Sequence, residues 1–86
     1  MIGKRRDLTE GIHALEPGEY GKDADGLWWA RVPQHDGFYS GMSRLSLHEV
    51  AEHEDGTITV SPSILVTGHH DRTWHGYLER GIWREV

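Results

Sequence analysis

Turn signals recur along the whole chain, and their spacing leaves room for only short elements between them. Glycine favours tight turns because it adopts positive φ without a steric penalty, and the pairs Pro-Gly and Asp-Gly strengthen the signal. Such signals lie at residues 16–19, 22–26, 55–56 and 80–81. This division predicts a mainly β fold, in which hairpins form a small antiparallel sheet. The alternative is a minor α+β fold, in which the sheet is accompanied by one short helix.

The strongest strand patterns lie in the second half of the chain. Residues 57–61 follow an Asp-Gly turn and alternate between apolar and polar side chains, as a half-buried strand does. Residues 74–79 and 82–86 flank the turn at 80–81 and predict a terminal hairpin. In the first of these strands one face carries Trp74, Gly76 and Leu78.

Prolines mark the limits of other predicted strands. Residues 27–32 form a compact apolar run that ends at Pro33, and the polar stretch 34–43 after it is typical of an exposed loop. Pro62 has no N–H to donate, so we expect it at a sheet edge or at a strand end, before a further extended segment over 63–67.

Residues 45–53 fit two structures. Ser46 and Glu49 have the spacing of a helix capping box, and Leu47, Val50 and Ala51 fit one helical face. A strand paired across the following Asp-Gly turn is the simpler interpretation, and it requires a bulge near Glu49.

The length of 86 residues predicts one domain over 1–86, in which residues 1–10 are expected to form a flexible arm or a short strand. A chain this short buries little surface, so a few large side chains must supply most of its core or its interface. The candidates are the four tryptophans, Trp28, Trp29, Trp74 and Trp83.

Composition excludes several classes of function. The absence of cysteine rules out disulfides and thiolate chemistry, and the net charge of −5 opposes binding to nucleic acid. No apolar signal region follows the basic N-terminus, and no stretch approaches the roughly twenty apolar residues of a membrane span. We therefore expect a cytoplasmic protein of a bacterial cell, without a membrane partner.

Two segments carry a resemblance to known proteins. Residues 55–64, DGTITVSPSI, and residues 74–83, WHGYLERGIW, resemble an uncharacterised domain-of-unknown-function family of small bacteriophage (actinobacteriophage-like) and bacterial proteins. The resemblance covers roughly the C-terminal half and implies a phage or prophage origin. Many relatives in this pattern place a cysteine shortly before the histidine, but this chain has none, so a metal site is not carried over.

Histidines are the main candidates for chemistry. Seven occur in the chain, and His69, His70 and His75 lie within seven positions of one another. Neutral imidazole binds Zn²⁺ well, so these three, with His48 or His53 or the carboxylate of Asp71, predict a structural or hydrolytic zinc site as the alternative function. The spacing matches no standard zinc motif, and surface histidines with a structural His75 are the simpler interpretation.

Catalysis has weaker support in the sequence. Ser61 and Ser63 lie near histidines, but no nucleophile elbow, Gly-rich phosphate loop or dinucleotide fingerprint is present. The leading hypothesis is therefore a non-enzymatic accessory protein that binds a host or phage protein, or itself, through an aromatic and acidic surface. Its acidic residues lie at 16–19, 23–25 and 49–55. The predicted contact residues are Trp28, Trp29, Phe38 and Tyr39.

Overall fold

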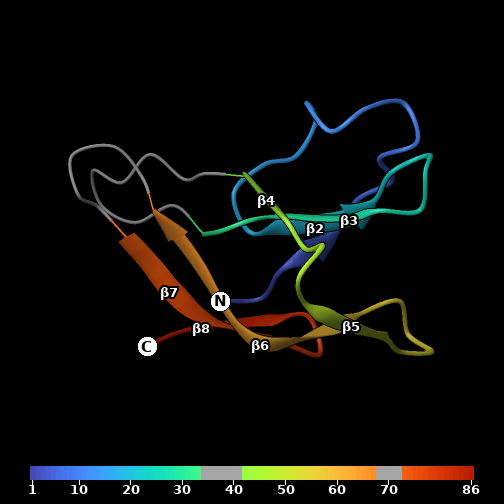
Figure 1. Cartoon of the computed structure of the whole chain (residues 1–86). Helices are drawn as coiled ribbons and strands as arrows, with labels where there is room; N and C mark the ends of the chain where they lie inside the picture. Colours follow the sequence, from blue (N-terminus) through green and yellow to red (C-terminus); the bar gives the residue numbers. More distant parts are fainter. Residues whose placement is uncertain (34–41, 68–72) are drawn as a thin grey trace.

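The computed structural model describes residues 1–33, 42–67 and 73–86 (Figure 1). Within these ranges the chain is mainly β, as predicted, and contains no helix, so none that could cross a membrane. The strands are β1 (Lys4–Arg5), β2 (Glu19–Lys22), β3 (Trp28–Arg31), β4 (Met42–Arg44), β5 (Glu49–Glu52), β6 (Ile58–Thr67), β7 (Thr73–Glu79) and β8 (Ile82–Glu85).

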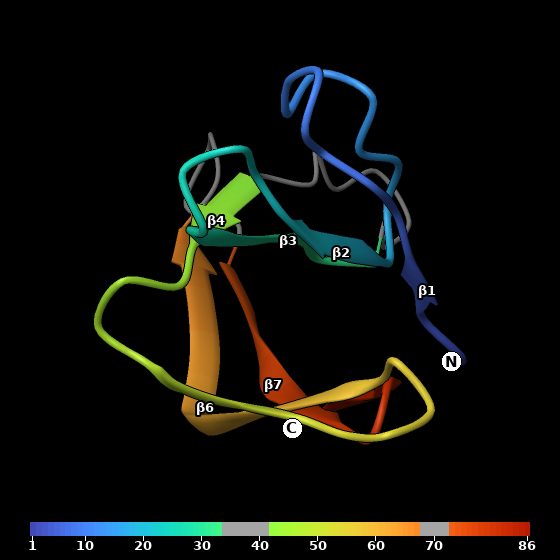
Figure 2. The ribbon, with the colours of Figure 1, turned by 90° about the vertical axis from the view of Figure 1, so that its right-hand side faces the viewer.

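The strands form two four-stranded sheets, each in chain order. The first sheet has the order β1-β2-β3-β4 and the second the order β5-β6-β7-β8. All pairs are antiparallel except β1 with β2, which is parallel. Figure 2 shows the two sheets facing each other, so the inward side chains of both meet in one core.

Trp83 joins the two sheets within this core. Its indole ring packs edge-on against Trp74, with ring centroids 5.4 Å apart and an angle of 84° between the planes. Its Nε1 donates a 2.8 Å hydrogen bond to the carbonyl of Gly18, which precedes β2. The core consists of Tyr20, Ala30, Val32 and Leu45 from the side of the first sheet, and Ile58, Val60, Ile64, Trp74, Leu78 and Trp83 from the second.

The N-terminal segment closes one side of the molecule. Residue 1 exchanges backbone hydrogen bonds with Trp83, and Gly3 donates one to the carbonyl of Gly81, so residues 1–3 cover the free edge of β8. The chain then continues into β1, which pairs with β2, and Leu8 is buried. The structure thus places residues 1–10, the predicted arm, against both sheets.

The segment 45–53 contains a strand and no helix. The chain turns after Leu45, and β5 begins at Glu49. Its pairing with β6 is regular from Glu49 opposite Ser61 to Glu52 opposite Ile58, so the predicted bulge near Glu49 is wrong. The Asp-Gly turn outweighs the capping-box pattern because it aligns two strands for pairing, whereas a short helix here would have no such partner.

The irregularity lies instead in β6, around Pro62. Val60 pairs with Leu78 and Ile64 with Gly76, so the β6 segment between them is longer than the β7 segment that it faces. Pro62 lies in this segment, where the ladder is interrupted and no N–H donor is required. Pro62 lies inside β6, so the strand-end alternative is wrong. The sheet-edge alternative is confirmed among the described residues, because the pairing with β5 stops at Ser61 and Pro62 has a paired strand only on the β7 side.

Alanine substitutions of two leucines in the second sheet test how much core packing contributes to the free energy of unfolding. Leu78 is fully buried, whereas Leu65 is 61% exposed. We expect Leu78→Ala to lower the free energy of unfolding by about 2–5 kcal/mol, because it removes core contacts and leaves a cavity. Leu65→Ala should change it by less than about 0.5 kcal/mol. Urea denaturation followed by tryptophan fluorescence measures both, and equal losses would contradict the assignment of the core.

Candidate functional site

Strand β7 presents two chemically different faces. Trp74, Gly76 and Leu78 are buried and point toward the core, as the sequence predicts. Alternation therefore directs His75, Tyr77 and Glu79 to the opposite side of the sheet, away from the core. These three residues form the middle of an exposed surface.

Neighbouring strands extend this surface on both sides of β7. In β6, Leu65 lies opposite His75; in β8, Arg84 lies opposite Tyr77 and Ile82 opposite Glu79. Paired residues in a sheet share a face, so all six side chains lie on one surface. We call this surface the outer face; it consists of Leu65, His75, Tyr77, Glu79, Ile82 and Arg84, with Ile2 and Val86 at its margin.

The outer face exposes much apolar surface. Leu65 is 61% exposed and Ile82 52%, while Ile2, which pairs with Ile82, is 81% exposed and Val86 75%. One exposed apolar side chain is ordinary on a protein surface, but several on one face of one sheet are a feature of binding sites.

Polar contacts hold the centre of the outer face. Arg84 donates a 2.6 Å hydrogen bond from Nη2 to Oε1 of Glu79, and this bond raises the pKa of Arg84. The Arg84 guanidinium also lies 4.8 Å from the ring centroid of Tyr77. Arginine beside an aromatic ring is a common composition at protein interfaces.

Ser63 is the only serine of the described residues that contacts two histidines. Its Oγ lies 2.8 Å from Nε2 of His75, and its carbonyl oxygen 3.1 Å from Nε2 of His48. A nucleophilic serine needs a base that a third group orients, and no carboxylate contacts His75 in the part of the chain that the structure describes. The arrangement gives Ser63 a structural hydrogen bond.

The histidines predicted as zinc ligands are only partly described by the structure. His69 and His70 lie outside the described residues, while His48 and His75 both contact Ser63. His53 contacts Oγ1 of Thr59 at 2.7 Å. Among residues 1–33, 42–67 and 73–86, no group of three or more potential ligands could hold a metal ion, and the zinc site stays a prediction.

Two of the four predicted aromatic contacts, Trp28 and Trp29, have intramolecular partners. Trp28 is partly buried, with the Arg5 guanidinium 5.1 Å and the Lys22 ammonium 4.9 Å from its ring centroid. Trp29 donates a 2.9 Å hydrogen bond from Nε1 to Asp23. Phe38 and Tyr39 lie outside the described residues, so the contact role of all four stays a prediction.

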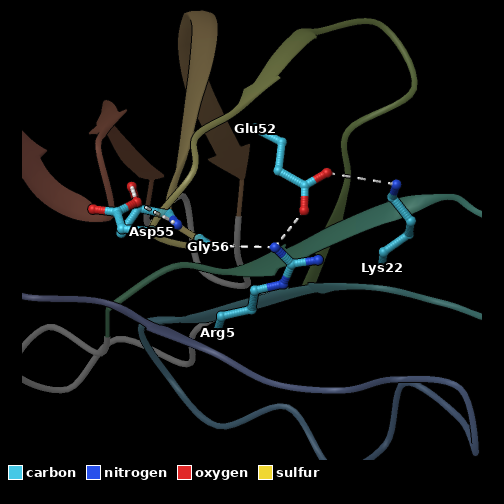
Figure 3. Close-up of polar contacts among 6 residues, drawn as sticks. Arg5, Lys22, Glu52, Asp55 and Gly56 are labelled. Carbon is cyan, nitrogen blue, oxygen red and sulfur yellow. Dashed lines mark hydrogen bonds and ion pairs between the residues drawn. The ribbon is translucent and has the colours of Figure 1, made fainter.

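Several acidic residues of the predicted binding surface also have partners within the chain. Arg5 of the first sheet donates a 2.5 Å hydrogen bond to Glu52 of the second and a 3.1 Å bond to the carbonyl of Gly56, and Lys22 lies 3.9 Å from Glu52 (Figure 3). The Arg5 hydrogen bond lowers the pKa of Glu52. Asp55 caps its own turn by accepting hydrogen bonds from Thr57. These carboxylates thus already have partners within the chain, and the role of the acidic surface in binding stays a prediction.

Glu19 is the buried member of this acidic set. Arg6 donates two hydrogen bonds to its carboxylate, 2.6 Å from Nε to Oε1 and 3.0 Å from Nη2 to Oε2. The backbone N–H of Glu16 donates a further 2.8 Å hydrogen bond to Oε1 of Glu19. The hydrogen bond from Arg6 contributes most to lowering the pKa of Glu19. Burial and full pairing together identify this carboxylate as structural.

Sequence reasoning missed the apolar members of the outer face. The signal was present in the alternation, because placing Ile64 and Trp83 toward the core directs Leu65 and Ile82 outward. The contribution of Ile2 had no local signal, since it depends on pairing with Ile82 at the other end of the chain. Comparisons of the chain with protein-family models, curated proteins and solved structures find no match.

The Arg6–Glu19 pair predicts a pH-dependent contribution to stability. Because folding lowers the pKa of Glu19, the pair stabilises the fold above the unfolded-state pKa of about 4.3 and loses this effect as pH falls through the folded-state value. We expect Glu19→Gln to lower the free energy of unfolding by about 1.5–3 kcal/mol at pH 7 and by less at pH 3.

Denaturant titration at the two pH values measures this difference. The control is Glu52→Gln, which alters a carboxylate that is also paired with an arginine but is 44% exposed and lies away from the outer face, and which should have a smaller effect at either pH. A loss for Glu19→Gln that is equally large at pH 3 would contradict the prediction.

Proposed function

We propose that this protein is a non-enzymatic accessory protein of phage or prophage origin that acts by binding another protein through the outer face. Its mode of action is recognition, with no chemical step. The observation that carries the proposal is the exposure of Leu65 and Ile82 on one sheet face, around Tyr77 and Arg84.

The composition of the outer face fits a protein-binding surface. Tyrosine and arginine are enriched at the centres of interfaces, because each offers a large contact area together with a directional polar group. Apolar side chains at Leu65, Ile82 and Ile2 surround this centre and would release water on binding. The β6–β7–β8 sheet behind the face is anchored by the core, so the surface is formed before binding.

The phage origin is supported by the resemblance in residues 55–64 and 74–83. The second of these segments supplies His75, Tyr77, Glu79 and Ile82. The part of the chain that resembles small phage and bacterial proteins is therefore also the part that builds most of the outer face.

Site-specific photocross-linking in bacterial cells tests the proposal. We expect p-benzoylphenylalanine in place of Ile82 to cross-link to one discrete protein, which mass spectrometry identifies. The same group in place of Leu47 is the control, because Leu47 is 93% exposed and Ile82 only 52%, so exposure alone would favour the control.

The Ile82 cross-link should be lost when Leu65→Asp is added, because a carboxylate on the outer face opposes the burial of apolar surface. Identical products from both positions, no product from Ile82, or a product that survives Leu65→Asp would each contradict binding through the outer face.

A further inference from the structure

We propose that the outer face binds the outer face of a second copy of this chain, forming a two-fold symmetric dimer. This inference rests on the proposed function and names its partner. It follows from the arrangement of charged and apolar side chains at the centre of the outer face.

Four residues at this centre form a block with two unlike diagonals. Tyr77 lies opposite Arg84, and the next outward pair along the strands is Glu79 opposite Ile82. One diagonal therefore joins Tyr77 to Ile82 and is apolar. The other joins Glu79 to Arg84 and carries one negative and one positive charge.

This block is complementary to itself. A two-fold axis that lies between two facing sheets and follows the Tyr77–Ile82 diagonal exchanges the positions of Glu79 and Arg84. Glu79 then meets the partner's Arg84, and Arg84 meets the partner's Glu79, while Tyr77 and Ile82 pack against their own copies. Like charges do not meet at the centre of this arrangement.

The existing ion pair does not oppose the exchange. Glu79 is 54% and Arg84 67% exposed, and an ion pair so accessible to water contributes little to the stability of the free chain. Covering the pair by a second sheet costs desolvation energy but strengthens each charge–charge contact, so the charges select the register while the apolar side chains supply affinity. The charges thus favour the face-to-face register.

Both ends of the outer face, with its margin, supply apolar area for the dimer. Leu65 and Val86 lie near one end of the exposed rows, and Ile82 and Ile2 near the other. A standard interface buries about 800 Å² on each partner. This is about one seventh of the 5554 Å² surface of the chain, so the dimer requires no unusually large share of it.

Charge-reversed variants test the dimer by complementation. Analytical ultracentrifugation should show wild-type dimers, whereas Glu79→Arg alone and Arg84→Glu alone each place like charges against each other and should weaken dimerisation by roughly tenfold or more. Mixing the two variants in equal amounts should restore a dimer, because the arginine introduced at position 79 of one chain then meets the glutamate introduced at position 84 of the other. Mixing cannot restore the pair within one chain, so recovery reports the contact between chains.

Glu10→Arg is the control for net charge, because it makes the same change as Glu79→Arg at an exposed residue far along the sequence from the outer face. It should leave the dimer intact, and circular dichroism with thermal melting shows whether each variant is folded. Wild-type monomers, folded single variants that dimerise normally, or a mixture that stays monomeric would each overturn the dimer. A monomer that still gives the Ile82-specific cross-link to a different protein would leave the proposed function standing.

Discussion

The packing of Trp83 is the constraint on which the rest of the structure depends. Its ring packs against Trp74, its indole N–H bonds the carbonyl of Gly18, and its backbone pairs with residue 1. The second sheet, the residue that precedes β2 of the first sheet and the N-terminus therefore all contact this one residue. Because Trp83 points into the core, its neighbours Ile82 and Arg84 must point outward, and the same contact that closes the fold creates the outer face.

Several charged side chains of the described residues have partners within the chain. Arg6 neutralises the buried Glu19, and Arg5 and Lys22 link the first sheet to Glu52 at the edge of the second. Some of the carboxylates that the sequence assigns to an acidic surface are therefore paired with basic side chains of the same chain. Charge complementarity on the outer face then contributes to which surfaces can meet.

Alternation and turn chemistry predicted the parts of the fold that depend on local sequence. The Asp55-Gly56 hairpin, the terminal hairpin and the buried face of β7 are all confirmed. The strand-end alternative for Pro62 and the bulge near Glu49 were wrong, because the sequence shows that a ladder must be interrupted but not at which point of which strand. The pairing of Ile2 with Ile82 was missed because contacts between the two ends of a chain leave no periodic signal. The outer face could therefore be inferred only in part.

Folding alone does not explain the side chains of the outer face. Tyr20, Ile64 and Trp83 are apolar because the core requires it, whereas an outward position in a sheet accepts threonine, lysine or glutamate at little cost to stability. Leucine and isoleucine at 65 and 82 instead leave water in contact with hydrocarbon and raise the risk of edge or face association. The outer face carries exposed apolar side chains at several paired positions. They surround the Glu79–Arg84 pair, whose contacts two copies of the chain can exchange. These are the properties expected of a surface that is covered when the protein acts.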